Sequence, residues 1–349
     1  MGNSIKYEIL KEPNYNDIAK CIGASPRQKR WKRHPDWGIK LLKFHATDTR
    51  LYIGAFENDK LVGCMIAHAD RLIIKGEILN CAIIAITEVI PTHEKKGIAS
   101  KMLDKMLSQI QLLDFDMALA FQSSGRGGRN ILKRAGFKKI HKYSHAAKVL
   151  DKDTMRNLLD INPILKNLAM KIADSKIGQT NPLRGSIREA RNEDLENIID
   201  LLNNRSKKID ITNFWTKENL KKKKDWRYKV FIFEDKGEIL ASVIRYEEIS
   251  YLGENEFLCG FLKELAFREG IEEIEKEIFI YNVLKTFKVD NIPNVSYPTS
   301  KPWVKILKKT GFRVLPGERT VFIKPLSDIA KQTVDKIDRF RSVNAFLIC

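Results

Sequence analysis

Two lysines and a glycine, Lys95, Lys96 and Gly97, stand between an apolar run and a segment of helical periodicity, where they could bind an anion. Glycine has no side chain, so a ligand can approach its backbone closely. Ile98 begins the helical segment, and the first four N–H groups of a helix have no partners inside the helix. With the helix dipole they make a site for a phosphate-like anion. The turn is therefore a candidate diphosphate site.

The same turn also has a simpler interpretation. Thr92 would cap an ordinary helix, and Lys95 and Lys96 would face water. Strand–turn–helix units that contain a glycine are common in α/β proteins. The turn alone does not decide between the two interpretations.

A strand and a helix must hold this turn in place. Residues 81–90 are a nearly unbroken run of apolar residues, interrupted by Thr87 and Glu88, which predicts a buried strand that ends at Pro91. Apolar residues then recur at helical spacing, at Ile98, Met102, Met106 and Ile110, with Leu103, Leu107 and Leu113 beside them. The sequence thus predicts a strand that leads into a helix through residues 92–97.

These residues resemble the GNAT superfamily of acyl-CoA-dependent N-acyltransferases. The resemblance rests on Val89 and Pro91, on Gly97-Ile98-Ala99, and on Arg134-Ala135-Gly136-Phe137 after the helix. In that family the pattern Arg/Gln-x-x-Gly-x-Gly/Ala places backbone amides on the diphosphate of coenzyme A, and here it falls on residues 94–99. The first position departs from the pattern, because Glu94 is acidic and a like charge nearby costs up to about 4 kcal/mol at a protein surface.

The resemblance implies a set of residues that contact acetyl-CoA or a related acyl-CoA. They are Val89, Ile90, Glu94, Lys95, Lys96, Gly97, Ile98, Ala99, Ser100 and Ser124. It also implies that the pantetheine arm lies beside the strand at 83–90 like an added strand. The N–H group of Val89 would then stabilise the oxyanion.

The sequence marks the general acid and the general base of the reaction less clearly than the coenzyme site. Glu88 interrupts the apolar strand and is the candidate base for the amine proton, although a salt bridge on the far face of the strand is an equal alternative. Leu132 stands where many members of the family carry a tyrosine that protonates the thiolate. His93 in the turn and His68 with Asp70 are more often structural. We predict no metal site.

The chain of 349 residues is long enough for two domains. The sequences around Asp17 and Gly136 recur about 175 residues later, around Asp194 and Gly311. We therefore expect an α/β protein of two tandem GNAT-like domains, each a mixed, mostly antiparallel sheet flanked by helices, plus a C-terminal helix. The expected divisions are an acetyl-CoA-binding domain at 1–150, a helical linker at 151–183, and a degenerate copy with the C-terminal helix at 184–349.

The second copy lacks the diphosphate turn. Its one glycine in the matching region is Gly270, and Glu272, Glu273, Glu275 and Glu277 follow it. Carboxylates at a helix start suit the dipole but repel a diphosphate. We expect this copy to bind no coenzyme A.

The formal net charge of +18 favours anionic partners in general. Two segments concentrate it. Residues 25–37 interleave basic residues with Trp31 and Trp37, and they are either a solvated loop anchored by its tryptophans or a binding surface for an acceptor or nucleic acid. The lysine run at 221–224 is either a solvated helix face or a polyanion site.

Other classes of protein are disfavoured. No apolar run approaches the roughly 20 residues of a membrane helix, and the first residues lack the apolar stretch of a signal peptide, so we expect a cytoplasmic protein. The five cysteines are widely spaced without a Cys-x-x-Cys pair, which argues against a disulfide framework and a zinc site. Cys81 is expected to pack as a small hydrophobic residue.

The sequence therefore predicts an N-acyltransferase that uses acetyl-CoA or a related acyl-CoA. The acceptor partner would be a primary amine on a small molecule, a peptide or a protein. Two alternatives stay open, a noncatalytic GNAT-like binding protein and a basic nucleic-acid-associated factor, with nucleic acid the less favoured partner.

Overall fold

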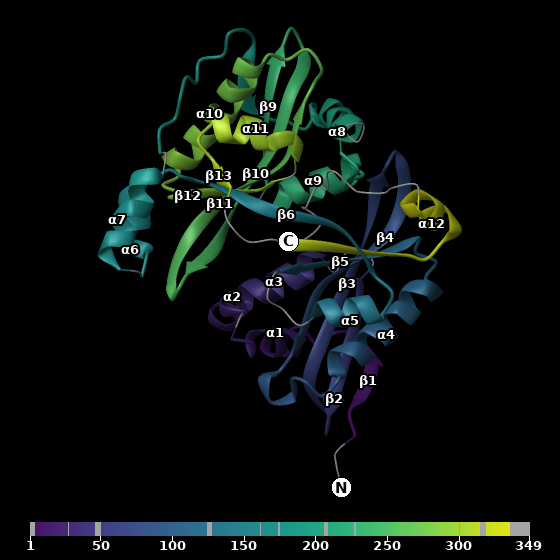
Figure 1. Cartoon of the computed structure of the whole chain (residues 1–349). Helices are drawn as coiled ribbons and strands as arrows, with labels where there is room; N and C mark the ends of the chain where they lie inside the picture. Colours follow the sequence, from purple (N-terminus) through teal and green to yellow (C-terminus); the bar gives the residue numbers. More distant parts are fainter. Residues whose placement is uncertain are drawn as a thin grey trace.

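The computed structural model describes residues 4–26, 28–45, 50–123, 128–160, 162–173, 175–205, 209–226, 228–299, 301–314 and 319–335. These residues form two lobes, each built on a mixed sheet with helices on both faces (Figure 1). One lobe is made mainly by the first half of the chain and the other mainly by the second. The predicted fold class is confirmed.

The sheet of the first half begins with an antiparallel meander and ends with a parallel strand. Its strands are β1 (Lys6–Ile9), β2 (Arg50–Glu57), β3 (Lys60–Ile74), β4 (Glu77–Val89) and β5 (Met117–Ser123). β5 runs parallel to β4, and the other neighbours are antiparallel. β3 and β4 are longer than the sequence predicts, because they continue to a tight turn in which Lys75 and Gly76 have positive φ.

Helices cover both faces of this sheet (Figure 1). One face carries α1 (Tyr15–Gly23), α2 (Lys29–Arg33) and α3 (Pro35–His45), and the other carries α4 (Ile98–Leu112) and α5 (Gly128–Arg134). Side chains alternate between these faces: Ile53 and Met65 pack in the core cluster under α4, whereas Tyr52, Cys64 and Ile66 pack under α1. The predicted amphipathic helix at 98–112 buries the apolar stripe that the sequence marks, except for Leu113, which follows the helix and is 50% exposed.

The second half repeats the plan. Its strands are β7 (Ser186–Glu189), β8 (Ile211–Asn213), β9 (Lys229–Asp235), β10 (Glu238–Leu252), β11 (Asn255–Phe267), β12 (Asn294–Thr299) and β13 (Arg313–Val314). Its helices are α8 (Leu195–Asn204), α9 (Lys217–Trp226), α10 (Glu273–Val289) and α11 (Lys301–Lys309). Apolar side chains of α8 and of α10 lie in separate core clusters. β8 leaves the lobe and pairs with β3 of the first half.

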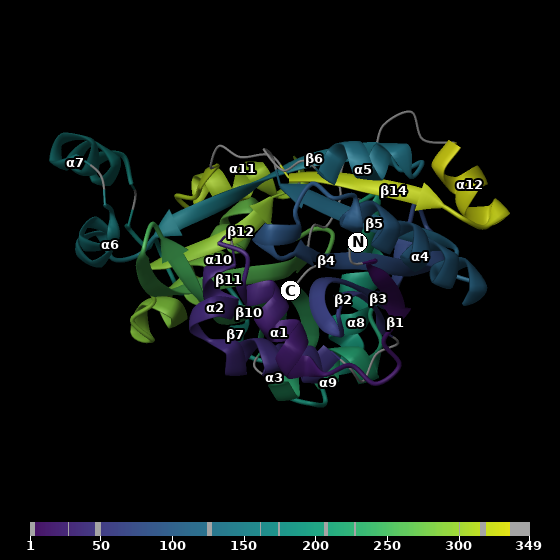
Figure 2. The same ribbon diagram turned by 90° about the horizontal axis from the view of Figure 1, so that it is seen from below.

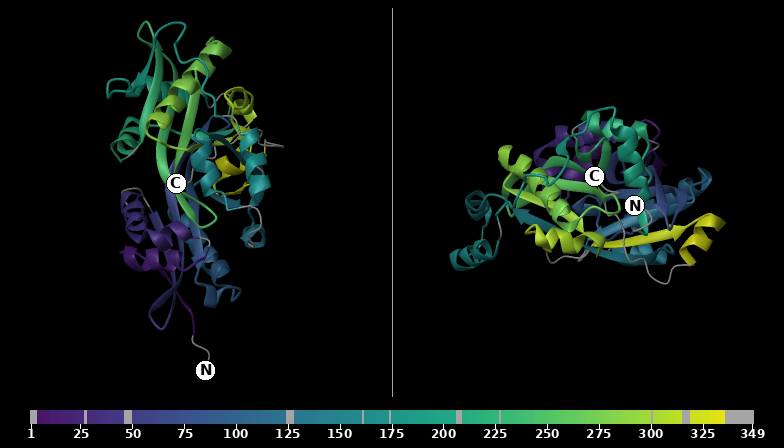
Figure 3. Two further views of the ribbon diagram at one scale, coloured as in Figure 1. Left: turned by 90° about the vertical axis from the view of Figure 1, so that its left-hand side faces the viewer. Right: turned by 90° about the horizontal axis from the view of Figure 1, so that it is seen from above.

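The two sheets are joined by an exchange of strands. β14 (Arg319–Pro325), near the end of the chain, lies between β5 and β6 (Lys138–Val149). The second part of β6 in turn pairs with β12 of the second half. One continuous path of strands therefore runs through both lobes. Figure 3 shows the lobes stacked with this junction between them.

Helices follow β6 and β14. α6 (Lys152–Leu158) and α7 (Pro163–Ile172) lie in the expected linker and project from the body (Figure 2). α12 (Asp328–Asp335) begins the predicted closing helix, whose later residues Ile337 and Phe340 lie outside the described residues. The domain boundaries at 150 and 184 stay a prediction.

The interpretation of residues 25–37 as a loop anchored by its tryptophans was wrong in its secondary structure, since α2 and the start of α3 lie there, but Trp31 is anchored in the core as that interpretation expects. The high density of charge hides the helical spacing in this segment. Trp31 is buried, and its ring lies so close to Gly38 that a Cβ there would be 2.3 Å away. Aromatic packing against a glycine therefore holds two short helices together.

No helix in the described ranges is long and apolar enough to cross a membrane. Cys81 is fully buried among apolar residues, as predicted.

Candidate active site

A gap opens between β4 and β5 at the centre of the first sheet. The two strands pair only from Cys81 and Met117 to Ile84 and Ala120, although both continue further. β4 carries one extra residue, Ala85, at this point, because Ile84 lies opposite Ala67 and Ile86 lies opposite Ile66. Such a bulge bends its strand and ends the pairing. The bulge thus leaves an edge of β4 unpaired, and a cavity of about 540 Å³ lies beside this edge.

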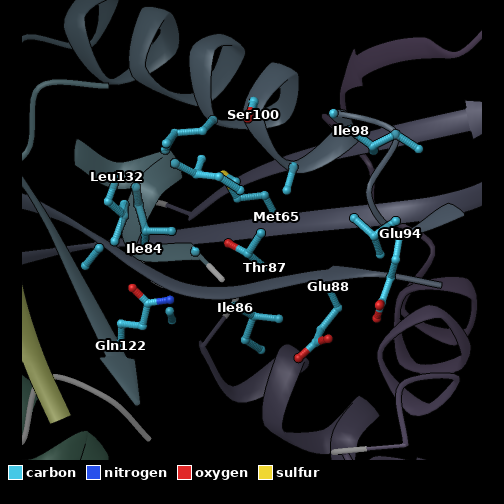
Figure 4. Close-up of a pocket in the computed structure, with 18 of the residues that line it drawn as sticks. Met65, Ile84, Ile86, Thr87, Glu88, Glu94, Ile98, Ser100, Gln122 and Leu132 are labelled. Atoms are coloured by element: carbon cyan, nitrogen blue, oxygen red, sulfur yellow. The ribbon is translucent and has the colours of Figure 1, made fainter. Parts of the chain in front are cut away.

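The bulge also reverses which face each side chain of β4 takes. Ile84 packs in the core cluster under α4, whereas Ile86 packs in the cluster under α1. After the bulge, Val89 lies with the α4 cluster. Figure 4 shows Glu88 on the same side of the strand as Ile86, opposite Thr87.

The backbone of β4 turns a donor toward the gap. The N–H of Ile90 donates to the carbonyl of Val62 on β3, at 2.9 Å. Successive residues of an antiparallel strand direct their N–H groups to opposite sides. The N–H of Val89 therefore points away from β3, toward the cavity that Val89 lines.

The cavity has an apolar interior and a polar rim. Its apolar walls are Met65, Ile84, Ala85, Ile86, Val89, Ile98, Ala99, Leu103, Ala120, Phe121, Ile131 and Leu132, with Gly97 and Gly128. Its polar residues are Gln28, Thr87, Glu88, His93, Glu94, Lys95, Ser100 and Gln122. Both the strand edge and the start of α4 thus reach one space (Figure 4).

The start of α4 has the form of an anion site. Gly97 precedes the helix with φ of 77°, no side chain caps the helix, and the space beside Gly97 is open. Ile98, Ala99 and Ser100, whose N–H groups lack partners within a helix, line the cavity. The alternative in which Thr92 caps this helix is wrong: Thr92 lies in the short 3-10 helix η1 (Pro91–His93), with its hydroxyl 2.8 Å from Nδ1 of His93.

Two carboxylates lie at the other side of the cavity. Figure 4 shows the carboxylates of Glu88 and Glu94 directed away from α4. Oε1 of Glu88 accepts a hydrogen bond of 2.5 Å from Nε2 of Gln28. Among the described residues neither carboxylate has an ion-pair partner, so the salt bridge considered for Glu88 is not found there. Glu94 does not occupy the space in front of the helix amides.

His93 is held by two neighbours. Its buried ring lies 3.1 Å from Oε2 of Glu57 through Nε2, in addition to the contact with Thr92. On the opposite strand Cys64 faces Glu88. A hydrogen bond with Cys21, together with burial, raises the pKa of the Cys64 thiol well above its usual value. Cys64 is therefore a neutral thiol beside the site, not a nucleophile.

The cavity brings together most of the residues that the sequence predicts as a site. Glu88, Val89, Glu94, Lys95, Gly97, Ile98, Ala99 and Ser100 all line it. Ile90 instead packs against the core, Lys96 is exposed, and Ser124 lies outside the described residues. Which of these residues contact a ligand stays a prediction.

Several lining residues were not predicted, among them the polar residues Gln122 and Gln28. Gln122 is buried at the end of the apolar strand β5, where its polar type was a usable signal. Gln28 comes from a segment 60 residues away from Glu88, and no local pattern marks it. Leu132, at the position of the family tyrosine, lines the cavity, so its side chain can supply no proton there.

The matching helix start of the second half, at α10, differs from that of α4. Gly270 has φ of 83°, but the N–H of Glu272, before α10, donates to the side chain of Glu275 at 3.1 Å. Arg184 in turn holds Glu275 through a hydrogen bond of 2.7 Å. At α10 the carboxylate of Glu275 therefore accepts from a backbone N–H at the helix start. At the start of α4 no side chain of the described residues does so, and the N–H groups there remain available.

The lysine run on α9 is partly engaged within the chain. Nζ of Lys224 donates to the carbonyl of Ala190 at 2.6 Å, and Nζ of Lys223 lies 4.8 Å from the ring centre of Trp215. These contacts favour the interpretation of a helix face over that of a polyanion site.

One family model matches the part of the chain that contains most of the cavity lining. The family model described as "Acetyltransferase (GNAT) domain" matches residues 19–127, which include β4, the turn and α4. Comparison with curated proteins found no significant match to this sequence.

Solved structures share the whole fold at low sequence identity. N-myristoyltransferase from Saccharomyces cerevisiae with bound myristoyl-CoA superposes with a TM-score of 0.69 and 12% identity, covering 93% of this chain and 80% of the other. A GCN5-related N-acetyltransferase from Kribbella flavida gives 0.61 and 12%, covering 94% and 72%. One from Anabaena variabilis gives 0.60 and 10%, covering 94% and 74%.

Proposed function

We propose that this member of the GNAT superfamily of acyl-CoA-dependent N-acyltransferases transfers an acetyl or related acyl group from coenzyme A to a primary amine. The amine would be carried by a small molecule, a peptide or a protein. The cytoplasm is the compartment we expect for it.

The uncapped start of α4 carries the proposal. A diphosphate needs several N–H donors at one point, and a helix start without a side-chain cap supplies them together with the positive end of the dipole. At α4 these donors adjoin a cavity, and no Cβ at Gly97 blocks the approach. Lys95, which lines the same cavity, adds a positive charge.

The edge of β4 suits the pantetheine arm. Beyond Ile84 no described strand pairs with β4 on the β5 side, so amide groups of the arm can pair with the strand as an added strand would. This path leads from the start of α4 along β4. It brings the thioester carbonyl within reach of the N–H of Val89, which would stabilise the oxyanion of the tetrahedral intermediate.

The acceptor would enter from the side of Glu88. The amine nitrogen attacks the thioester carbon, the C–S bond breaks, and coenzyme A leaves as a thiolate. Glu88 is the candidate base that takes the amine proton. Because Leu132 supplies no acid, we infer that the rate depends mainly on holding the reactants together, which can lower a barrier by about 7–11 kcal/mol. The carboxylates of Glu88 and Glu94 favour an acceptor with positive charge.

Calorimetric titration with coenzyme A tests the proposal. We expect micromolar binding by the wild type and at least a 30-fold weaker affinity in Ala99→Glu, which places a carboxylate among the helix amides. The control is Ser108→Glu, which adds the same charge at an exposed position farther along α4 and should leave the affinity within threefold. No binding by the wild type, or equal losses in the two variants, would refute the proposed site.

A further inference from the structure

The β10–β11 hairpin of the second half contacts α2, a helix of the first half that lies next to Gln28 in the cavity lining. This contact affects the position of Glu88. We infer that the β10–β11 hairpin holds α2 so that Gln28 keeps its hydrogen bond to Glu88. Gln28 is then a positioning residue for the amine acceptor. The inference rests on the proposed function, because it assigns a role to the half that lacks a diphosphate site.

Polar contacts along the whole length of α2 join this helix to the hairpin. Arg30 pairs with Glu248 at 2.9 Å, and the side chains are only 20% and 9% exposed. Arg33 donates to the backbone and side chain of Glu254, at 2.9 and 2.7 Å. Nζ of Lys29 donates to the carbonyl of Gly253 at 2.9 Å and also pairs with Glu254. The short turn of the hairpin therefore binds successive cations of α2.

Further contacts extend this interface. The guanidinium of Arg33 lies 5.3 Å from the ring centre of Tyr251, and His34, just after α2, pairs with Glu256 at 2.7 Å. The hydrogen bond from Lys29 lowers the pKa of Glu254, and the one from His34 lowers that of Glu256. Both carboxylates are thus stabilised in their charged form.

These contacts fix α2 together with the packing of Trp31. α2 has five residues and no side-chain cap, and a helix this short is not stable alone. Arg30 and Arg33 are three residues apart and therefore share one side of the helix. That side meets the hairpin, while Trp31 is buried in the core of the first half. The orientation of α2 is set jointly by the two halves of the chain.

Gln28 links the orientation of α2 to the position of Glu88 in the cavity. It immediately precedes α2, and its carbonyl accepts the hydrogen bond of 3.1 Å from the N–H of Lys32. Its side-chain amide donates to Oε1 of Glu88 at 2.5 Å. With one oxygen held, the other oxygen of Glu88 is directed for the proton of the acceptor. A shift of α2 would move the amide away and let the carboxylate rotate.

The experiment distinguishes an effect on the reaction with the acceptor from an effect on coenzyme binding. Glu248→Gln removes the negative charge that pairs with Arg30, and Glu254→Gln, at an exposed position, weakens the same interface without endangering the fold. The matched control is Glu196→Gln, which removes one carboxylate of an exposed ion pair with Lys217 elsewhere in the second half. Kinetics would use acetyl-CoA and a peptide with a free N-terminus and a lysine as the amine probe.

We expect kcat/KM for the peptide to fall about tenfold in Glu248→Gln and about threefold in Glu254→Gln, with affinity for coenzyme A unchanged within twofold. Gln28→Leu should lower kcat/KM by at least as much as Glu248→Gln does. In the double variant Gln28→Leu with Glu248→Gln the loss should equal that of Gln28→Leu alone, because the effect passes through Gln28. Fully additive losses, or a loss shared by Glu196→Gln, would overturn the inference.

Hydrogen exchange gives a readout that needs no turnover. Amides of residues 28–33 should exchange at least tenfold faster in Glu248→Gln, while those of α4 keep their rates. Unchanged exchange at 28–33 would overturn the inference even with an active enzyme. A wild type that binds no coenzyme A would instead refute the proposed function and leave the exchange result to decide the role of the hairpin.

Discussion

Arg30 on α2 and Glu248 on β10 form a 2.9 Å ion pair between the two halves of the chain. The basic segment at 25–37 thus meets an acidic surface that belongs to the same molecule. Lys29 and Arg33 are engaged by the same hairpin. Part of the net charge of +18 is therefore used inside the protein, which weakens the alternative that this segment binds nucleic acid.

Glu94 should weaken coenzyme binding through its charge alone. Because its carboxylate points away from α4, Glu94→Gln should tighten the affinity for coenzyme A by only about two- to fivefold. The gain should shrink at high salt. Calorimetric titration at two ionic strengths checks this, with Glu77→Gln at the far end of β4 as the control. A gain of more than about 20-fold would mean that Glu94 contacts the diphosphate.

Glu88→Gln should lower kcat without affecting the coenzyme. The amide cannot take the amine proton, and general bases contribute about 10²–10⁴-fold. We expect a fall of at least 10²-fold in kcat for the peptide acceptor, with an unchanged dissociation constant for coenzyme A. Glu57→Gln, which removes the partner of His93 but not Glu88, is the comparison. Equal losses in both variants would argue for a structural effect.

Phe322 should be essential for the first half, although it lies near the end of the chain. It is 1% exposed and packs with Met65, Met102 and Ala120 in the cluster under α4. Phe322→Ala should lower the free energy of unfolding by about 3–5 kcal/mol. Urea unfolding measures the loss. Val314→Ala, at an exposed position on β13, should cost less than about 0.5 kcal/mol.

Asp194 should make the second half sensitive to acid. The guanidinium of Arg188 donates to both of its oxygens at 2.7 and 2.9 Å, and this lowers the pKa of Asp194. A lowered pKa stabilises the fold above the unfolded value of about 3.9, and the stabilisation is lost as the pH falls through the folded value.

Asp194→Asn should therefore cost about 2 kcal/mol at pH 7, and the difference from the wild type should shrink steadily as the pH falls below the unfolded value of about 3.9 and through the lower folded value. Urea unfolding at several pH values tests this. Glu193→Gln, at an exposed neighbouring site, should match the wild type throughout. A difference that does not shrink as the pH falls below about 3.9 would mean that packing, not charge, explains the loss.

The sequence predicts the parts of the fold that depend on local patterns. The strand over the apolar run at 81–90 and the helix over the periodic segment after Ile98 both follow from residue type. The pairing of β14 with β5 does not, because strand partners distant in sequence leave no local signal. For the same reason the hydrogen bond between Gln28 and Glu88 could not be predicted.

The short helix α2 illustrates a different limit. Its charged residues look like a solvated surface, since a single sequence shows charge but not the partner that neutralises it. Only the fold brings Glu248 and Glu254 opposite Arg30 and Arg33. The bulge at Ala85, which turns Glu88 toward α2, also depends on the register of β3 and β4.

The exchange of β6 and β14 between the lobes limits how the molecule can move. β6 pairs with β14 in the first lobe and with β12 in the second, so a wide hinge opening would have to bend β6 sharply or break its backbone ladder with β12. Entry and exit of reactants must therefore occur by small local rearrangements around an essentially rigid frame. The two lobes therefore cannot separate as independent rigid bodies.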